Sequence, residues 1–132
     1  MDNSLTGMYG EAIVLTCLLS WGYPATLVFG PLPYDLVVDI DGESYKVQVK
    51  ATDREYEHGK FENSFSFNVS KSGQQYTSES YDILACVALS NHKVLFLPFT
   101  RKLRIRRKVS TFTQKKEWAS WEDCLDHLRK KD

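Results

Sequence analysis

The stretch "YDLVVDIDGESYKVQVK", residues 34–50, decides the fold. Polar and apolar side chains alternate along 34–41 and again along 44–52, which is the pattern of strands with one face on a core. Between the two runs lies Asp41-Gly42, a dipeptide typical of two-residue hairpin turns. The stretch therefore predicts two antiparallel strands joined by a tight turn.

This hairpin brings together side chains of different chemistry. Gln48 and Lys50 share one face of their strand, roughly 6–7 Å apart, and the turn can place Asp35 beside them. Mg²⁺ accepts carboxylates and neutral oxygens such as the Gln48 amide and the Val49 carbonyl, and a lysine can stabilise charge on a reacting phosphate. The pattern indicates a metal site for phosphodiester hydrolysis, although "KVQVK" alone also describes an amphipathic edge strand.

A helix is predicted over 6–21, where apolar residues recur at helical spacing and Gly22 follows as a C-terminal cap. The apolar stripe consists of Met8, Ala12, Leu15 and Leu19. Glu11 lies close to this stripe. It either faces solvent as a partner of the helix dipole or points at the sheet as the second carboxylate of the metal site.

The rest of the chain predicts more strands than helices. Further strands are expected at 25–29, 64–70, 82–89 and 93–99, with a short helix or turn region between Ser72 and Ser80. A last helix is expected at about 118–130, because Ser120 with Asp123 resembles a capping box. Its apolar stripe, which would dock on the core or on a second subunit, consists of Trp118, Trp121, Leu125 and Leu128. With 132 residues, this order predicts a single α/β domain with a mixed sheet.

The net charge of zero conceals an asymmetry along the chain. Residues 1–100 carry 6 basic and 12 acidic side chains, whereas residues 101–132 carry 11 basic and 5 acidic ones. The tract 101–116 has 8 basic residues and no acid, which predicts a polyanion partner or, more simply, a solvated face. The expected DNA contacts are Arg101, Lys102, Arg104, Arg106, Arg107 and Lys108, with Arg54, His58 and Lys60 from a second, polar segment.

The three cysteines, Cys17, Cys86 and Cys124, match no metal-ligand spacing and predict free thiols of a reducing compartment. The N-terminus does not have the pattern of a signal peptide, and no apolar run is long enough for a membrane span. These features predict a cytoplasmic protein without a membrane partner.

Four residues together carry a resemblance to a known family. Glu11 on a helix, Asp35 on a strand, and Gln48 and Lys50 on the adjacent strand match the order of the PD-(D/E)XK nucleases, which the stretch 7–52 resembles most closely. Two letters depart from the pattern: Gln48 replaces the second acid, and Tyr34 separates Pro33 from the aspartate. The Q-x-K form is similar to the branch of group I intron homing endonucleases, whose core is also that of Holliday junction resolvases.

The resemblance implies a restriction-endonuclease-like αβββαβ core over 1–100, a mixed central sheet flanked by helices, with 101–132 as a basic DNA-contacting segment and C-terminal helix. It implies a Mg²⁺-dependent endodeoxyribonuclease, with Mn²⁺ as a substitute, bacterial or phage-encoded. Metal would be held by Glu11, Asp35, Gln48 and Val49, and Lys50 would position the attacking water. The expected activity is site-specific cleavage of double-stranded DNA by a homodimer or homotetramer. A junction-resolving or repair nuclease and a non-catalytic DNA-binding module are the alternatives.

Overall fold

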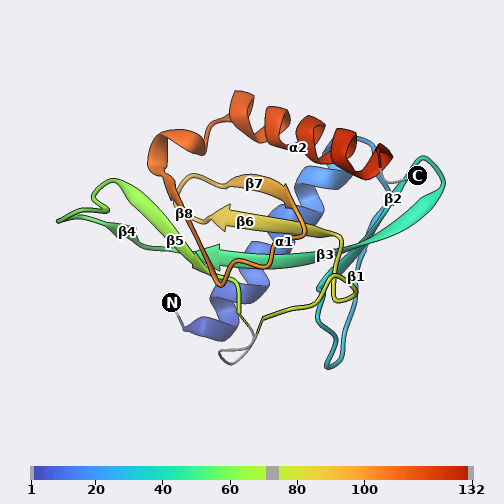
Figure 1. The fold of residues 1–132 in the computed structure, drawn as a ribbon, viewed down its shortest axis with the longest axis horizontal. Coiled ribbons are helices and arrows are strands. Elements are labelled where there is room, and N and C mark those ends of the chain that lie inside the picture. Colours follow the sequence, from blue (N-terminus) through green and yellow to red (C-terminus); the bar gives the residue numbers. More distant parts are fainter. Residues whose placement is uncertain (1, 71–74, 131–132) are drawn as a thin grey trace.

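The computed structural model describes residues 2–70 and 75–130 (Figure 1). The helices are α1 (Asn3–Ser20) and α2 (Gln114–Arg129), and a short 3-10 helix, η1, spans Val109–Thr111. The strands are β1 (Ala25–Leu27), β2 (Leu36–Ile40), β3 (Glu43–Thr52), β4 (Glu55–Tyr56), β5 (Ser64–Asn68), β6 (Ile83–Ala88), β7 (Lys93–Pro98) and β8 (Arg104–Lys108).

The strands form two sheets. The larger has the order β1-β2-β3-β6-β7, and it is mixed because β3 and β6 run parallel while the other neighbours run antiparallel. The smaller has the order β4-β5-β8. In Figure 1, α1 crosses behind the large sheet, α2 runs along β7, and the small sheet extends to the left. The predicted α/β class with a mixed sheet and flanking helices is confirmed.

The hairpin of residues 34–50 forms as predicted. Asp41 and Gly42 both have positive φ angles, 53° and 84°, which is the conformation of a type I′ turn. The turn fixes the register with Ile40 opposite Glu43 and Leu36 opposite Val47. The side chains that face the core, including those of Leu36 and Val47, are fully buried.

A hydrophobic core lies on each face of the large sheet. On one face the sheet packs against α1 and α2, and on the other it packs against β5, β8 and Phe112. Strand β6 contributes to both cores, since Ala85 belongs to the first and Cys86 to the second. This explains why the sequence of β6 is apolar without alternation. Residues beyond 100 enter both cores, through Ile105 in the second and Trp121 in the first.

Helix α1 begins before the predicted residue 6, because the Asp2 side chain accepts a hydrogen bond from the Leu5 amide and caps the helix at Asn3. It ends as predicted at Gly22, whose φ is 88°. Of the predicted apolar stripe, only Leu15 packs partly against the core; Met8, Ala12 and Leu19 are exposed. The residues that α1 buries are Gly10, Val14 and Leu18, whereas Met8 is 63% exposed and Leu19 51% exposed.

The start of α2 was predicted incorrectly. The helix begins at Gln114, with the Thr113 side chain accepting a hydrogen bond from the Lys116 amide. Ser120 is therefore inside the helix and buried. Its hydroxyl donates to the Glu117 carbonyl and accepts from the Phe96 amide of β7. Of the predicted stripe, Trp118 remains 42% exposed while Trp121, Leu125 and Leu128 are buried.

Three further predictions concern the segment that precedes β6, the state of the cysteine thiols and membrane-spanning helices. In the described part of the predicted helix-or-turn region, Thr77 and Ser80 close a turn, and residues 71–74 lie outside the description. The cysteines are free, and burial raises the thiol pKa values of Cys17, Cys86 and Cys124 to about 12. Within the described ranges, neither helix combines the length and the hydropathy that a bilayer crossing needs.

Candidate active site

The site forms where β2 and β3 separate. The pairing of these strands ends at Leu36 opposite Val47, but β3 continues to Thr52. Asp35 occupies the fork: its amide donates to the Val47 carbonyl at 2.8 Å, and its Oδ2 accepts from the Val49 amide at 2.8 Å. The Asp35 carboxylate therefore accepts a hydrogen bond that a backbone carbonyl of β2 would have accepted if the pairing of the two strands had continued past Leu36.

The Val49 carbonyl points into the same fork. The amide and the carbonyl of one residue in an antiparallel ladder face the same neighbour, and the Val49 amide faces Asp35. The other edge of β3 is already paired with β6. The fork therefore presents a peptide oxygen next to the carboxylate.

Glu11 reaches this region because α1 crosses β3 at very short range. The crossing point is Gly10, where an added Cβ would lie 2.7 Å from the Cβ of Ala51 and 3.5 Å from Cγ1 of Val49. Only a residue without a side chain allows this approach. Its neighbour Glu11 is partly buried and feels the charge of Asp35. Glu11 therefore lies near enough to Asp35 for the two charges to interact, and its role as the second carboxylate of a metal site stays a prediction.

Both carboxylates have raised pKa values. Burial is the larger cause for Glu11, and repulsion from Asp35 adds to it. Burial also raises the pKa of Asp35, against the opposing effects of the Val49 hydrogen bond and the Lys50 charge. Burial is thus the main cause of both raised pKa values, and a cation bound beside the two carboxylates would lower them. Within residues 2–70 and 75–130, no group of three or more His, Cys, Asp or Glu side chains gathers as a metal site, in keeping with a glutamine in the third position.

Gln48 and Lys50 lie on the opposite face of β3 from Val49 and share one partner, Tyr76. Gln48 is 5% exposed, and its amide nitrogen donates to the Tyr76 hydroxyl at 2.9 Å. The Lys50 ammonium is 3.5 Å from the same hydroxyl and 5.5 Å from the ring centroid. With its nitrogen engaged, the Gln48 amide keeps its carbonyl oxygen for another partner.

Tyr76 is the site residue that sequence reasoning missed. It lies 26 residues beyond Lys50, in a segment without strand or helix periodicity. The structure holds it through burial and an edge-to-face contact with Tyr81, whose ring centroid is 5.6 Å away. No local pattern around Tyr76 signals this role.

Other predicted residues lie apart from the fork. Arg54 and His58 are exposed and line a separate surface hollow of about 710 Å³ together with Asp53, Glu55 and Glu57. The surrounding acids make this hollow less attractive to a polyanion than the sequence suggested. The role of Arg54 and His58 in DNA binding stays a prediction.

The basic tract forms the outer face of the small sheet. Arg104, Arg106 and Lys108 alternate with the buried Ile105, and they lie opposite Asn68, Ser66 and Ser64 of β5. The Arg106 guanidinium lies 4.1 Å from the ring centroid of Phe61. Lys60 approaches the same ring at 5.7 Å.

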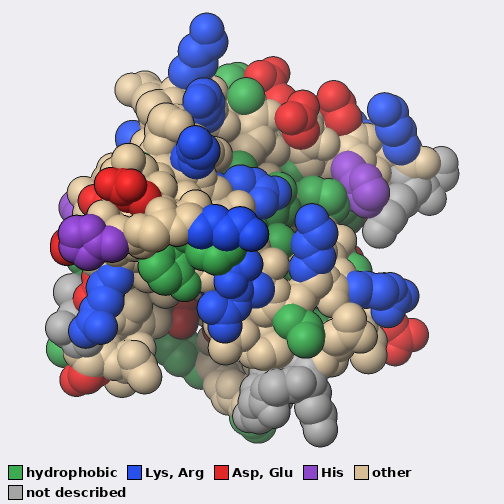
Figure 2. Space-filling model, turned by 60° about the vertical axis from the view of Figure 1, so that its left-hand side comes forward, with side chains coloured by type: hydrophobic (Ala, Val, Ile, Leu, Met, Phe, Trp, Pro, Cys, Tyr) green, Lys and Arg blue, Asp and Glu red, His purple; other side chains and the backbone are tan. Residues whose placement is uncertain are grey.

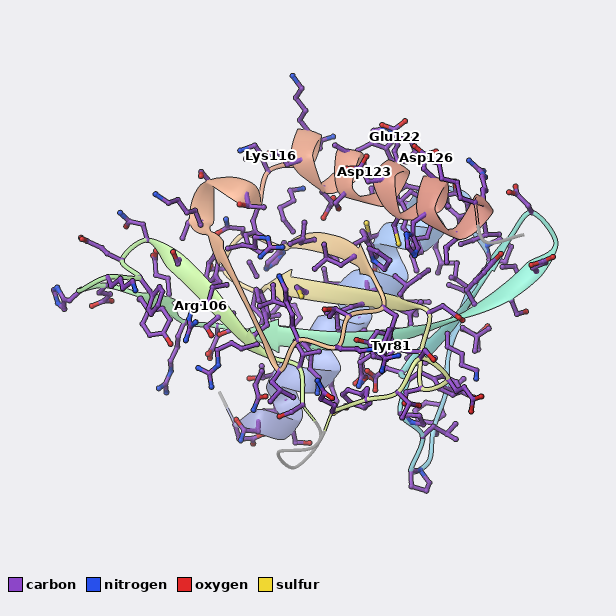
Figure 3. All side chains as sticks on the ribbon, in the orientation of Figure 1. Tyr81, Arg106, Lys116, Glu122, Asp123 and Asp126 are labelled. Atoms are coloured by element: carbon purple, nitrogen blue, oxygen red, sulfur yellow. The ribbon has the colours of Figure 1, made fainter. Side chains whose placement is uncertain are left out.

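The charge is divided between two surfaces of the molecule. Figure 2 shows Lys and Arg side chains spread over the middle of the face that contains the small sheet. Figure 3 places Arg106 on this sheet, and it places Glu122, Asp123 and Asp126 along the outward side of α2. A polyanion is therefore attracted to the small sheet rather than to the second half of α2.

A sequence model of the family described as PD-(D/E)XK endonuclease matches residues 1–119. The chain belongs to the PD-(D/E)XK endonuclease family. The match extends beyond residue 100, where the sequence alone showed no resemblance, and it includes β8.

Two solved structures share the fold of this family member. The bacterial homing endonuclease I-Ssp6803I superposes with a TM-score of 0.67 at 16% identity, covering 97% of this chain and 98% of its own. The Archaeoglobus fulgidus Holliday junction resolvase Hjc superposes with a TM-score of 0.50 at 17% identity, covering 80% and 86%. No curated protein matches the sequence significantly.

Proposed function

We propose that the protein is a divalent-metal-dependent endonuclease that cuts double-stranded DNA at a specific site. One observation carries the proposal: Asp35 sits in the β2–β3 fork, hydrogen-bonded to the Val49 amide and electrostatically coupled to both Glu11 and Lys50. Two acids and a lysine around an open strand edge are the groups that phosphodiester hydrolysis requires.

The donor set fits Mg²⁺, with Mn²⁺ as a substitute. Asp35 and Glu11 offer two carboxylates whose pKa values are raised chiefly by burial. The Val49 carbonyl and the Gln48 amide oxygen are neutral hard ligands, which Mg²⁺ accepts while it keeps several waters. When bound, such an ion polarises the phosphate and lowers the pKa of a coordinated water.

The protein's own groups orient the reactants. Lys50 supplies a positive charge on the Asp35 side of β3, where it can hold the attacking water and stabilise the negative charge that accumulates on the phosphate. Tyr76 holds the Gln48 amide nitrogen and lies against the Lys50 ammonium. These contacts reduce the rotamer freedom of both side chains before DNA binds.

We assign DNA recognition to the outer face of β5 and β8. A two-stranded ribbon fits the major groove, and this ribbon carries Arg104 and Arg106 opposite Asn68 and Ser66. Arginine and asparagine can form bidentate contacts with guanine and adenine. Arg101, Lys102 and Lys108 suit phosphate contacts. Arg107, which we also assign to phosphate binding, lies opposite the buried Phe65 on the Ile105 side of β8 and is half-buried.

Cleavage of both DNA strands requires two active sites, since one active site cuts one DNA strand. A symmetric homo-oligomer, a homodimer or a homotetramer, is the simplest way to supply them.

A junction resolvase is the second candidate, because Hjc shares the fold. The similarity to the homing endonuclease extends over more of both chains, which supports a linear target. The test compares cleavage of a linear duplex library with cleavage of a four-way junction in Mg²⁺. Cuts at one linear sequence support the proposal, and cuts confined to the junction assign the protein to the resolvases. Binding without cleavage in either metal identifies a DNA-binding module.

A further inference from the structure

The outward face of α1 carries an apolar stripe that the monomer leaves largely open to solvent; within the stripe, Leu15 is half-buried against the first core. The residues of the stripe are spaced by three and four positions in turn: Leu5, Met8, Ala12, Leu15 and Leu19. Leu5, Met8 and Leu19 are 53%, 63% and 51% exposed, and Ala12 is exposed as well. A different face of α1, formed by Gly10, Val14 and Leu18, packs against the sheet.

The composition of α1 suits burial on this second face. Among its 18 residues the only charged one is Glu11, which is partly buried and interacts electrostatically with Asp35. A solvated helix face normally carries charged or polar side chains, and a helix that is apolar on most sides is buried. Because the stripe carries no charge, it does not suit a polyanion such as DNA. It has the charge depletion of the centre of a protein interface.

The stripe is symmetric about Ala12 to within one residue. Leu5 and Leu19 each lie seven residues from it, and Met8 and Leu15 lie four and three residues from it. A second copy of α1, turned by a two-fold axis through Ala12, therefore places Leu5 against Leu19 and Met8 against Leu15. Such a self-matching patch is what an isologous contact requires, and the small side chain at the centre lets the two helices approach closely.

A groove beside the stripe offers space for the partner's larger side chains. Its volume is about 820 Å³, and its walls include Ala12 and Thr16 of α1 together with Trp118 of α2. Trp118 is the one residue of the predicted α2 stripe that stays exposed, at 42%. When this surface packs against a second copy of the chain, the protruding side chains of each copy can enter the groove of the other.

From these observations we infer that the stripe on α1 is a homodimer interface, formed by antiparallel packing of two α1 helices around Ala12. The inference concerns the assembly alone. It is measured without DNA or metal. A dimer that forms through another surface would overturn it and leave the proposed nuclease activity untouched, whereas a monomeric wild type would also remove the homo-oligomer proposed for cutting both strands. A dimer without nuclease activity would contradict the proposed function alone.

The first test is the mass of the protein in solution, by light scattering on a sizing column and by sedimentation equilibrium. The wild type has at least twice the 15.2 kDa mass of one chain. Met8→Glu combined with Leu19→Glu halves the mass of the assembly, because each dimer would bury four carboxylates. Phe29→Glu is the matched control: Phe29 is 86% exposed and lies outside α1. A monomeric wild type, or a folded Met8→Glu/Leu19→Glu variant of unchanged mass, overturns the inference.

The second test is cross-linking, in a Cys17→Ser background that removes the half-buried thiol. Ala12→Cys forms a disulfide-linked dimer under mild oxidation, since the axis places the two Cβ atoms together. Met8→Cys does not link to itself, because the two copies lie about 12 Å apart along antiparallel helices, but it links to Leu15→Cys when the two proteins are mixed. Self-linking of Met8→Cys, or no linking of Ala12→Cys, contradicts antiparallel pairing at this face.

Discussion

At the scale of single residues, Gln48 sets the charge of the site. An acid in its place would give three carboxylates around the fork, whereas this chain has two, Glu11 and Asp35. The glutamine is buried and held by Tyr76, so it is part of the local structure and not a surface replacement. Metal binding therefore depends more heavily on the two carboxylates that remain.

At neutral pH, the partly buried Asp35 carboxylate lowers the stability of the metal-free protein. Its folded-state pKa is raised above 3.8, so the group favours folding only while protonated, and this contribution is lost as the pH rises through the raised value. Asp35→Asn should raise the unfolding temperature in EDTA at pH 7 by about 2–4 °C, with the gain vanishing near pH 4, while cleavage is abolished. The exposed carboxylate of Asp39, which bonds to Ser44, gives the control variant Asp39→Asn. Equal unfolding temperatures for wild type and Asp35→Asn at pH 7 would refute this account.

Tyr76→Phe isolates the hydroxyl from the ring. The variant keeps the edge-to-face contact with Tyr81 but releases the Gln48 amide and the Lys50 ammonium. Single-turnover cleavage should slow about tenfold, the cost of roughly 1.4 kcal/mol of positioning, with unchanged DNA affinity. Thr77→Ala, at the neighbouring exposed position, should cleave at the wild-type rate. A wild-type rate for Tyr76→Phe would remove the hydroxyl from the mechanism.

At the scale of elements, the crossing of α1 over β3 positions Glu11. Gly10→Ala brings a methyl group to 2.7 Å from the Ala51 side chain, so the helix must shift away from the sheet. The variant should lose thermal stability and cleave at least tenfold more slowly. Gly7→Ala is the matched control, because nothing lies within 4 Å of a Cβ at that position and the exchange favours the helix by about 0.5–1 kcal/mol. Equal activity of the two variants would show that the close crossing does not matter.

The exposed arginines of β8 lead to a prediction about DNA affinity. Neutralising Arg104 and Arg106 should weaken binding and reduce the slope of log affinity against log salt by about 2, since each arginine that neutralises a phosphate contributes about one unit to this slope. Lys130→Ala, at the far end of α2, should leave the slope unchanged. A double variant with the wild-type slope would mean that the small sheet does not touch phosphates.

Local patterns predicted the elements whose signals lie within a few residues. The β2–β3 hairpin follows from alternation and Asp41-Gly42, and the end of α1 follows from Gly22. The predicted start of α2 was wrong because it relied on a capping pattern at Ser120, whereas the helix is capped by Thr113. The stripe on α1 was real, but the sequence could not tell which of two apolar faces meets the sheet, and the close approach of Gly10 to Ala51 decides it.

At the scale of the whole molecule, non-local pairings escaped prediction. The pairing of β5 with β8 joins segments about forty residues apart and turns the basic tract into a sheet face. Tyr76 lies in the connection between β5 and β6 and contacts Gln48 from 28 residues along the chain. By contrast, four of the five proposed catalytic or metal-binding residues lie on the hairpin itself. Its pairing ends at Leu36 opposite Val47, so Asp35 lies beside the part of β3 that carries Gln48, Val49 and Lys50.

The central claim is that the fork hydrolyses DNA with the help of a divalent ion. The most direct measurement is a cleavage map of fragmented host or phage DNA captured by the protein, with Mg²⁺ or Mn²⁺ added after capture. We expect wild type to cut at defined positions only after metal addition, and Lys50→Ala to capture the same fragments without cutting them. Absence of cleavage by wild type in either metal, on linear DNA and on four-way junctions alike, would contradict the claim.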